Sequence, residues 1–312
     1  MSHVIQVDHL TKEYKKLRAV DDLSFTVETG EILGLLGPNG SGKSTTINCI
    51  LTLLSYQNGN IRIFGEAMRP NAYDLKRKIG VVFQEVAVFE ELSVYDNINY
   101  FCGLYIKDRK QRKQYVEDAI ALVELQDFKK FMPKQLSGGL LRRLNIACGI
   151  AHKPELIFLD EPTVAVDPQS RNAILEGIKE LNRRGASIVY TSHYMEEVEI
   201  LCDRVIILDK GKLLASGTCD ELKKLASIEE KISVEIRGLD KAHYEHIQAM
   251  EQVESVNYDG QVLQIIYKQG QDHLIALMGY LQQEHIPYHR IYSERPTLND
   301  VFLELTGKEL RD

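Results

Sequence analysis

The sequence lacks long apolar runs, a secretion signal and closely spaced cysteines. No apolar run approaches the roughly 18 residues that a membrane-spanning helix needs, so work at a membrane would require another chain to supply the spans. Residues 1–8 have neither the charged nor the apolar region of a signal peptide. The five cysteines form no Cys-x-x-Cys pair, which argues against a metal or redox site of that type and predicts free thiols in a reducing cytosol.

An excess of positive charge is also absent, because the net charge is −7. This balance argues against a dominant nucleic-acid-binding surface, so no nucleic-acid partner is expected. The length of 312 residues allows two domains of usual size. Hydrophobic residues at 44% and charged residues at 27% are typical of an ordinary globular protein.

The most informative segment is a glycine-rich string that matches the phosphate-binding pattern G-x-x-x-x-G-K-[ST]. It consists of Gly37, Pro38, Asn39, Gly40, Ser41, Gly42, Lys43, Ser44 and Thr45. The glycines let backbone N–H groups converge on phosphate oxygens at a helix start. Lys43 adds a positive charge for the terminal phosphates, and the Ser44 hydroxyl is placed to hold Mg²⁺. A glycine-rich turn is the alternative, but the apolar run 32–36 before it and the helix-like segment after it favour a nucleotide site.

Apolar strand-like segments alternate with helical segments over the first 226 residues. Strands are predicted at 4–7, 23–27, 61–65, 79–83, 156–160 and 187–191, and helices over most of 93–131, including 109–125, and over 140–150. This alternation predicts an α/β fold with a mostly parallel sheet that is covered on both faces. Because ligands of such sheets bind at the carboxyl ends of strands, the phosphate loop, Asp160 and His193 are expected to converge on one site.

The pattern changes after residue 226, which predicts a separate small α+β domain over 227–312. The predicted elements are a strand at 232–236, a helix at 241–250, a hairpin of 253–258 and 262–267, a helix at 272–284 and a strand at 286–292. This order is β-α-β-β-α-β, with Asp259-Gly260 as the hairpin turn.

A final amphipathic helix is predicted over 298–305. Leu298, Val301, Phe302 and Leu305 make an apolar stripe on it. The stripe docks either onto its own small domain or onto a dimer or regulatory partner.

Two acids, Asp160 and Glu161, follow the apolar strand 156–160. A buried strand that ends in Asp suits Mg²⁺, which is usually held by one or two carboxylates together with phosphates. The adjacent Glu161 can orient or deprotonate an attacking water. The alternative is a pair of acids that face solvent, which the phosphate loop in the same chain makes less favoured.

A second anion site is predicted at residues 136–139, Leu-Ser-Gly-Gly. Ser137 is a good N-cap, Gly138 and Gly139 open the backbone, and the following residues have helical periodicity. One chain has no evident need for two phosphate-binding helix starts, whereas two chains that share nucleotides do.

These motifs, in this order, resemble the ATP-binding subunit of an ABC transporter over about residues 4 to 220. The resemblance implies an ABC-type ATP-binding domain over 1–226, with an antiparallel β subdomain and a helical subdomain at about 85–150. It also implies that ATP and Mg²⁺ bind, and that two subunits pack head to tail. Each ATP then lies between the phosphate loop of one subunit and the signature, residues 136–139, of the other.

The resemblance assigns roles to single residues. Tyr14 corresponds to the aromatic residue that stacks on adenine, although it can also be a strand-end aromatic. Gln84 corresponds to the glutamine that contacts Mg²⁺, and Asp160 to the carboxylate that binds this ion. Glu161 corresponds to the catalytic glutamate. His193 corresponds to the switch histidine that contacts the γ-phosphate, with a histidine satisfied at a helix start as the alternative.

Two positions depart from the family pattern. Leu140 stands where the signature usually has Gln, and Ala165 stands where Gly is frequent in the dimer-contact loop 163–167, in which Asp167 has the acidic position. Neither departure alters Glu161 or His193, so hydrolysis is expected. The departures leave open whether the second subunit is another copy or a related, different ATPase chain.

The C-terminal segment 295–307 resembles the tail of bacterial exporters of the daunorubicin-resistance type. Such subunits pair with separate membrane permeases, so the chain is expected at the cytoplasmic face of the cell membrane. Tyrosines 95, 100 and 105 are candidates for an exposed edge beside the groove that receives a permease helix. The expected activity is ATP hydrolysis that drives export of a drug, antibiotic or other amphiphile.

Other classes of protein remain as rivals at this point. A soluble ABC-type ATPase that acts on ribosomes or DNA is one, but the chain has a single motif set and no long coiled-coil insertion. A P-loop kinase or GTPase is another, and residues 136–139 and His193 have no role in such a protein.

Overall fold

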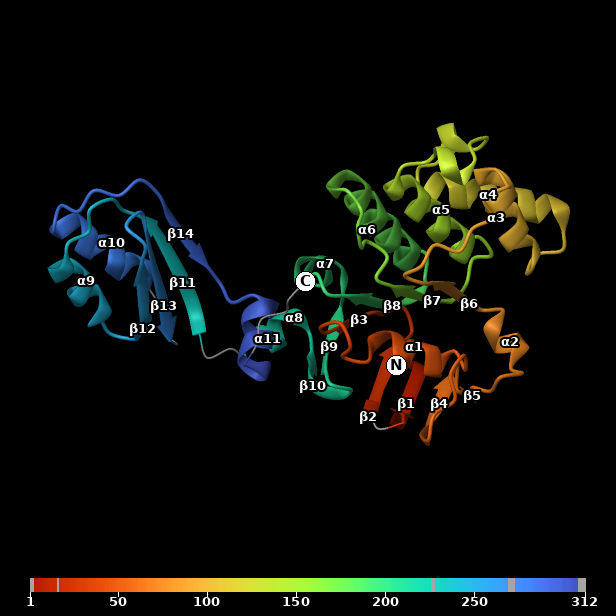
Figure 1. Ribbon diagram of the computed structural model, residues 1–312, viewed down its shortest axis with the longest axis horizontal. Coiled ribbons are helices and arrows are strands. Elements are labelled where there is room, and N and C mark those ends of the chain that lie inside the picture. The colour runs from red at the N-terminus through yellow and green to blue at the C-terminus, as the bar shows by residue number, and fades with distance from the viewer. Residues whose placement is uncertain (1–2, 16, 226–227, 269–272, 308–312) are drawn as a thin grey trace. The chain divides into compact units, whose positions relative to one another are not determined.

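The computed structural model describes residues 3–15, 17–225, 228–268 and 273–307 (Figure 1). The chain divides into two compact units, with the division between Cys219 and Asp220. This position is close to the change of sequence pattern after residue 226. The first unit contains the phosphate loop, and the second contains the β-α-β-β-α-β segment.

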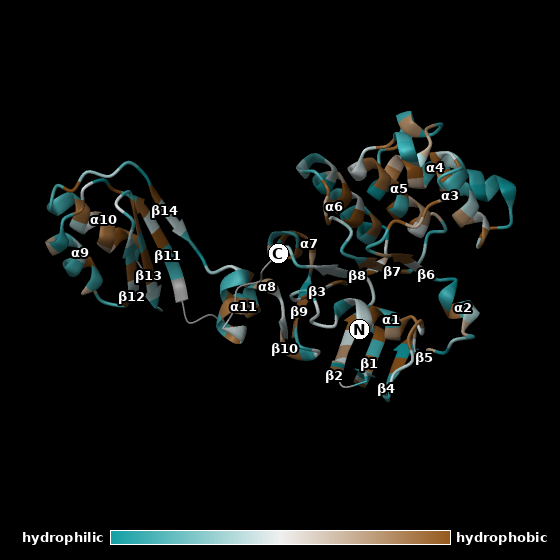
Figure 2. Cartoon of the chain, in the orientation of Figure 1, coloured by the Kyte–Doolittle hydropathy of each residue, from teal (hydrophilic) through white to brown (hydrophobic). Residues whose placement is uncertain are grey.

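A six-stranded sheet forms the centre of the first unit, in the order β10-β9-β3-β8-β7-β6. Its strands are β3 (Ile32–Leu36), β6 (Ile79–Val82), β7 (Leu156–Asp160), β8 (Ser187–Ser192), β9 (Arg204–Asp209) and β10 (Lys212–Gly217). All neighbouring pairs are parallel except β9 and β10. Every residue of β3, β7 and β8 is buried, as the apolar runs predict for strands that are covered on both faces. Figure 2 shows the apolar character of these central strands.

A second sheet of the first unit is antiparallel, in the order β2-β1-β4-β5. Its strands are β1 (His3–Tyr14), β2 (Leu17–Glu28), β4 (Asn58–Ile63) and β5 (Glu66–Ala67). β1 and β2 are longer than predicted, because buried positions extend beyond the predicted apolar segments, to Lys12 in β1 and back to Val20 in β2. β4 ends at Ile63 rather than residue 65, since Phe64 and Gly65 turn with positive φ into β5.

One hydrophobic core joins the two sheets through helix α1 (Lys43–Ile50). Buried side chains of α1, such as Ile47, pack with Leu33 and Phe158 of the parallel sheet and with Val7 of the antiparallel sheet. The helix that starts at the phosphate loop is therefore anchored to both sheets by apolar contacts on its buried side. Burial of this kind stabilises by about 25 cal/mol per Å² of apolar surface.

The remaining helices of the first unit form a helical region and the crossovers between strands (Figure 1). They are α2 (Tyr73–Lys76), α3 (Val94–Gly103), α4 (Arg109–Leu122), α5 (Gly138–Ile150), α6 (Pro168–Arg183) and α7 (Met195–Leu201), with short 3₁₀ turns at Gln126–Phe128 and Pro133–Gln135. α3, α4 and α5 pack against one another. α4 ends three residues before the predicted end, because Glu124 adopts a left-handed φ of 55°.

The second unit contains a four-stranded antiparallel sheet in the order β12-β13-β11-β14. Its elements are α8 (Cys219–Lys223), β11 (Ile228–Glu235), α9 (Lys241–Gln248), β12 (Val253–Tyr258), β13 (Val262–Lys268), α10 (His273–Gln283), β14 (Ile291–Glu294) and α11 (Leu298–Thr306). The predicted β-α-β-β-α-β order is present, and the Asp259 carboxylate accepts N–H bonds from Gln261 and Val262 in the hairpin turn. The predicted start of α10 at residue 272 lies outside the described residues.

The last strand of this sheet was placed too early by the sequence. We predicted residues 286–292, and the strand is Ile291–Glu294, paired with β11. Ile286 is buried in the core of the small sheet, so its apolar side chain reflects packing of the segment before the strand. The apolar pattern therefore marked a buried position and not a strand position.

Helix α11 has the predicted start and end signals. Thr297 forms a capping box with Asp300, and Gly307 ends the helix with φ 66°. Leu298, Val301 and Phe302 are buried, but Leu305 is 40% exposed, so the predicted stripe lacks its last member. The three buried residues are not among those of the small-sheet core in the described part of the chain.

His152, just after α5, makes stability depend on pH. Its ring stacks on Tyr105 at 3.8 Å, Nε2 lies 3.1 Å from the Ile79 carbonyl, and burial lowers its pKa from 6.5 to about 4. The unfolded chain therefore binds a proton between pH 6.5 and 4 that the folded chain does not, so stability falls as pH falls through this window. We expect wild type to lose about 3 kcal/mol relative to His152→Phe between pH 7 and 4.

Urea unfolding of both proteins at a series of pH values measures this difference. The phenylalanine keeps the stacked contact with Tyr105 and removes the titrating group. Parallel stability curves for the two proteins would show that His152 does not titrate in this window.

Candidate nucleotide site

The phosphate loop connects the buried strand β3 to α1, as the sequence predicts. Gly40 and Gly42 have φ values of 83° and 105°, in the left-handed region that favours glycine. Gly42 is the N-cap of α1 and, as a glycine, has no side chain that could accept from the first N–H groups. The first N–H groups of a helix have no acceptor within it, so this helix start is suited to an anion.

Close packing explains two of the loop glycines. A Cβ on Gly37 would lie 2.3 Å from the Leu208 carbonyl oxygen and 2.6 Å from Ser41 Oγ. A Cβ on Gly42 would lie 2.5 Å from the Ala19 carbonyl oxygen. The loop is therefore pressed against β9 and the β2 segment. Gly40 has open space around it, so its positive φ alone accounts for glycine there.

Lys43 is the cation of the site and only 4% of it is exposed. Its Nζ donates to the carbonyl oxygens of Gly37 at 2.7 Å and Pro38 at 3.3 Å. It also lies 3.3 Å from Glu161 Oε1. A buried ammonium is costly without partners, and these partners hold it at the mouth of the loop.

The two acids after β7 are buried and separately held. The Thr191 hydroxyl of β8 donates to Asp160 Oδ1 at 2.6 Å. The same hydroxyl accepts from the Glu161 N–H at 2.9 Å. Thr191 therefore positions both the predicted metal ligand and the predicted catalytic glutamate. The alternative in which the acids face solvent is wrong, since both are 5% exposed.

Two predicted residues, Lys43 and His193, meet at the carboxylate of the predicted Glu161. One oxygen lies 3.3 Å from Lys43 Nζ, and the other lies 3.4 Å from His193 Nδ1. Apart from this ion-pair contact, His193 Nδ1 is buried and makes no hydrogen bond to any described residue. An orphaned ring nitrogen next to the phosphate loop suits an additional polar ligand. The carboxyl ends of β7 and β8 thus converge on the loop after β3, as predicted.

The structure places the other predicted ligands less tightly. Ser44 and Thr45 are half-buried in the first turn of α1, and Gln84 is exposed in the loop after β6. Tyr14, at the end of β1, is 42% exposed, with Lys12 Nζ 4.8 Å from its ring centre. Among the described residues, no hydrogen bond or ion pair joins these side chains to Asp160, whose Oδ1 accepts from Thr191. Their roles toward a nucleotide therefore stay predictions.

The donor set fits a phosphate-bound Mg²⁺ better than a metal held by protein alone. In the part of the chain that the structure describes, no group of three or more His, Cys, Asp or Glu could hold a metal ion. Ser44 and Asp160 supply a hydroxyl and one carboxylate, which are hard oxygen donors. Mg²⁺ usually binds one or two carboxylates and takes its other ligands from phosphates and water.

The signature residues begin α5, which confirms the predicted helix start. Ser137 is the N-cap and its Oγ accepts from the Leu140 N–H at 3.3 Å. Ser137 and Gly138 are exposed, whereas Gly139 is buried. In the dimer-contact loop, Ala165 has φ 58°, which explains why a glycine suits that position. Asp167 caps α6 by accepting from the Ser170 N–H at 2.9 Å.

The two signature glycines should respond differently to alanine. A Cβ on Gly139 would lie 2.3 Å from Ser170 Oγ and 2.7 Å from Asp167 Oδ2, whereas a Cβ on Gly138 meets nothing within 4 Å. We expect Gly139→Ala to lower the free energy of unfolding by about 1–3 kcal/mol. Gly138→Ala should change it by less than about 1 kcal/mol. Urea titration of the two variants checks the contrast, and equal effects would contradict the packing of α5 on α6.

Sequence reasoning missed three residues of the site. Thr191 ends the predicted strand 187–191, and no motif marks it as a site residue. Arg142 of α5 donates to carbonyls of both catalytic loops. Glu197 of α7 is 3% exposed and accepts from Thr163 Oγ1 and Tyr190 Oη, both at 2.7 Å. Each acts through contacts between segments that are distant in the sequence, so no local motif marks them.

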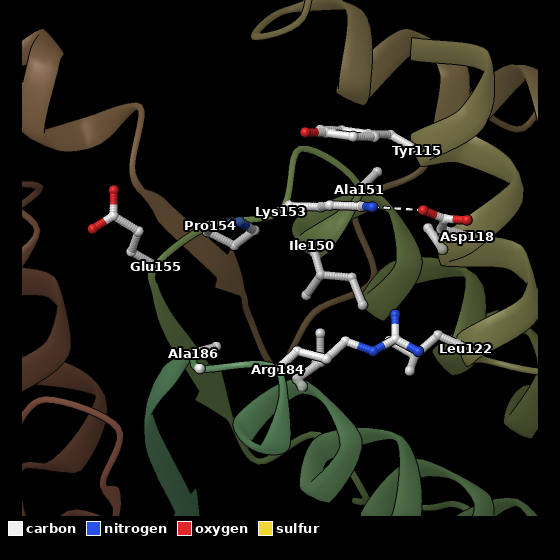
Figure 3. Close-up of a pocket in the computed structure, with 13 residues that line it drawn as sticks. Tyr115, Asp118, Leu122, Ile150, Ala151, Lys153, Pro154, Glu155, Arg184 and Ala186 are labelled. Atoms are coloured by element: carbon white, nitrogen blue, oxygen red, sulfur yellow. Dashed lines mark hydrogen bonds and ion pairs between the residues drawn. The ribbon is translucent and has the colours of Figure 1, made fainter. Parts of the chain in front are cut away.

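A second hollow of about 230 Å³ lies away from this site, between α4, the α5–β7 loop and the α6–β8 loop (Figure 3). Lys153 reaches between Tyr115 and Asp118, with an ion pair of 2.5 Å to the carboxylate. Arg184 is paired with Glu180 at 2.8 Å. The hollow adjoins the amino ends of β7 and β8, opposite to the nucleotide site, and both of these cations already have partners.

Comparison with known proteins identifies the family. The ABC transporter family model matches residues 20–164, and the model "ATP-binding protein DrrA1-3-like, C-terminal domain" matches residues 217–306. The chain is 37% identical over 311 residues to the linearmycin resistance ATP-binding protein of Bacillus subtilis (strain 168), covering 99% of this chain and 100% of that protein. The chain belongs to the family of ABC transporter ATP-binding proteins. It is therefore an ATPase subunit, and nothing supports the alternative of a ribosome- or DNA-acting ATPase.

Other relatives of this ABC protein are similar along nearly their whole length. The daunorubicin resistance ATP-binding protein of Streptomyces coeruleorubidus is 32% identical, covering 98% of this chain and 97% of that protein. The Nod factor export ATP-binding protein I of Ralstonia nicotianae (strain ATCC BAA-1114 / GMI1000) is 32% identical, with coverage of 99% and 95%. The predicted resemblance to subunits of the daunorubicin-resistance type is thus confirmed.

Solved structures agree with the fold of this ABC subunit. The ATP-binding subunit of an ABC transporter superposes with a TM-score of 0.65 at 27% identity, covering 71% of this chain and 92% of that chain. A dimeric ATP-binding cassette in a post-hydrolysis state, bound to ADP and Pi, gives 0.63 at 27% identity, with coverage of 69% and 98%. Among the described residues, no helix has the length and apolar character to cross a membrane.

Proposed function

We propose that the ABC subunit binds Mg-ATP at the carboxyl edge of the large sheet and hydrolyses it there. Lys43 and the N–H groups of the phosphate loop hold the β- and γ-phosphates, and Tyr14 stacks on the adenine. Ser44, Gln84 and Asp160 would hold Mg²⁺, which would neutralise charge on the phosphates. The observation that carries this proposal is that Lys43 and His193 both contact the carboxylate of Glu161.

Glu161 acts on the water that attacks the γ-phosphate. Its carboxylate is buried, and the N–H bonds from its backbone to the Thr191 side chain and carbonyl fix its position. His193 Nδ1, which makes no hydrogen bond within the described part of the chain, steadies the γ-phosphate. Binding of this phosphate would draw Lys43 away from the carboxylate and leave Glu161 free to accept a proton.

The site is completed by a second copy of this chain, with a related ATPase subunit as the other candidate. Ser137 and Gly138 are exposed at the start of α5. Backbone N–H groups of this first turn that Ser137 does not cap can bind a phosphate of the partner's nucleotide. ATP binding closes the two copies and hydrolysis reopens them. Leu140 contributes no polar contact, so the backbone and Ser137 carry this recognition.

The partner that crosses the membrane is an integral-membrane permease, and the subunit works at the cytoplasmic face through it. An aromatic surface beside the Gln84 loop suits docking of a permease helix. Phe89 and Tyr100 are 42% and 47% exposed there and contact each other edge to face at 4.9 Å, whereas Tyr105, 40% exposed, stacks on His152 instead. Exposed aromatic clusters of this kind mark interfaces. Tyr95, which we also expected at this edge, is half-buried.

The cargo is proposed to be a drug, antibiotic or other amphiphile that is exported. Relatives with nearly full-length similarity are named for resistance to linearmycin and daunorubicin, and another for export of Nod factor. In this proposal a permease, which is a separate chain, chooses the cargo, and the ATPase subunit supplies the driving force.

Purification of the ATP-trapped subunit from gently solubilised membranes tests this function. Glu161→Gln should hold ATP and keep its partners, so a multi-span protein should co-purify in stoichiometric amount. Lys43→Ala, treated in parallel, serves as the control for capture that does not depend on the nucleotide. Mass spectrometry identifies the partner, and ribosomal or DNA-associated proteins in its place would overturn the transport proposal.

A further inference from the structure

Arg142 connects three parts of the site that are far apart in the sequence. It belongs to α5, five residues after Ser137, and is only 4% exposed. Its Nη1 donates to the Gln84 carbonyl at 2.6 Å and the Phe83 carbonyl at 3.1 Å, in the loop after β6. The signature helix is therefore joined directly to the loop that carries Gln84.

A second edge of the same guanidinium, formed by Nε and Nη2, holds the loop after β7. Nε donates to the Pro162 carbonyl at 2.8 Å, and Nη2 donates to the carbonyls of Glu161 and, at 3.5 Å, of Asp160. All five acceptors are backbone oxygens, so the contacts fix the main chain rather than a neighbouring carboxylate. A planar guanidinium with its donors in a fixed fork can hold two loops at once.

Glu161 needs such support because its backbone is strained. Its φ of 48° lies in the left-handed region, which is uncommon for a residue with a side chain. Strained residues persist only where their surroundings over-determine them. The Glu161 N–H is held by Thr191, and its carbonyl is held by Arg142. Loss of the hydrogen bond from Arg142 to the Glu161 carbonyl should let this peptide relax and turn the carboxylate away from the attacking water.

We propose that Arg142 is a positioning residue that locks the main chain of Glu161 and Gln84 to the signature helix, so that both loops move with α5. The proposal rests on the ATPase function and on the role of Glu161 proposed above, and it adds a route by which a nucleotide on the signature affects the catalytic loops of the same chain. Arg142 does not touch the nucleotide. Its removal should therefore act on turnover and not on the first binding of ATP.

Arg143, the next residue of α5, provides a matched control. It is also buried, at 8% exposed, but its Nη1 pairs with Glu124 at 3.2 Å and its Nη2 lies 3.5 Å from Ser170 Oγ. These contacts do not reach the loops after β6 or β7. Replacement of Arg143 by lysine therefore removes a guanidinium from the same helix without releasing the main chain of Glu161.

The test compares Arg142→Lys with Arg143→Lys in the full-length chain. Lysine keeps the charge and the aliphatic stem but loses the fork. For Arg142→Lys we expect kcat to fall at least about 10-fold, while KM for ATP and the affinity for a fluorescent ATP analogue change less than about 3-fold. Arg143→Lys should keep kcat within about 2-fold of wild type. Thermal melting confirms that both variants are folded.

The positioning role of Arg142 and the catalytic role of Glu161 can fail independently. A kcat for Arg142→Lys within about 2-fold of wild type would overturn the positioning role. A fall in affinity that accounts for the whole loss of activity would overturn it too, because it would place Arg142 in nucleotide binding. The role of Glu161 is tested separately, by comparing wild type with Glu161→Gln. Equal rates of ATP hydrolysis in these two proteins would overturn the role of Glu161, whatever the Arg142 variants show.

Discussion

Glu161→Gln should abolish most ATP turnover and leave ATP binding intact. The carboxylate is buried between Lys43 and His193, at 3.3 Å and 3.4 Å, in the position of a group that acts on the attacking water. Glutamine has nearly the same shape but cannot accept the proton. Because general-base catalysis contributes about 10²–10⁴-fold, we expect kcat to fall by at least about 100-fold.

Phosphate release and titration with a fluorescent ATP analogue measure the two quantities separately. Glu155→Gln is a suitable control, because Glu155 is an exposed acid just before the same strand and lies 3.4 Å from Lys78. This control should hydrolyse ATP like wild type. Turnover of Glu161→Gln at the wild-type rate would remove Glu161 from the chemistry.

Lys43→Ala should weaken ATP binding by about 10–100-fold. The ammonium is the buried cation of the phosphate loop, held by the Gly37 carbonyl at 2.7 Å and ready to exchange that contact for phosphate oxygens. Hydrogen bonds between charged groups contribute about 1.5–3 kcal/mol, which corresponds to that range of affinity. The variant also leaves the buried Glu161 without its cation, so some loss of stability should accompany the loss of binding.

Calorimetric titration with ATP measures the affinity of this variant. Lys153→Ala removes a lysine of the same unit that is paired with Asp118 in the second hollow and serves as the control. Its affinity for ATP should equal that of wild type. An unchanged affinity in Lys43→Ala would contradict the assignment of residues 37–45 as the phosphate cradle.

The local parts of the fold and site were predictable because they depend on short-range rules. β3 and β7 are fully buried runs of five residues, and a run of apolar residues bounded by glycine or acid indicates such strands. Ser137 caps α5 as its sequence indicates. The phosphate loop was recognisable because only glycine satisfies its positive φ and close contacts.

The parts that escaped prediction depend on tertiary contacts. The left-handed φ of Glu161 leaves no mark on its neighbours in sequence, and neither does the double hydrogen bond of Thr191 to Asp160 and Glu161. Arg142 is separated by 58 and 20 residues from the carbonyls of Gln84 and Pro162 that it holds. In the second unit, Ile286 misled the placement of β14 because a buried loop residue has the same apolar character as a strand residue.

The central claim is that two copies of this chain close over ATP, with Ser137 and Gly138 of one copy on the nucleotide of the other. Light scattering of purified Glu161→Gln measures it most directly, with Ser137→Arg added in the same chain as the control. The account predicts a molar mass that doubles from 35.6 kDa when Mg-ATP is added, and no doubling with Ser137→Arg. A molar mass that stays at 35.6 kDa while Mg-ATP is bound would contradict this claim.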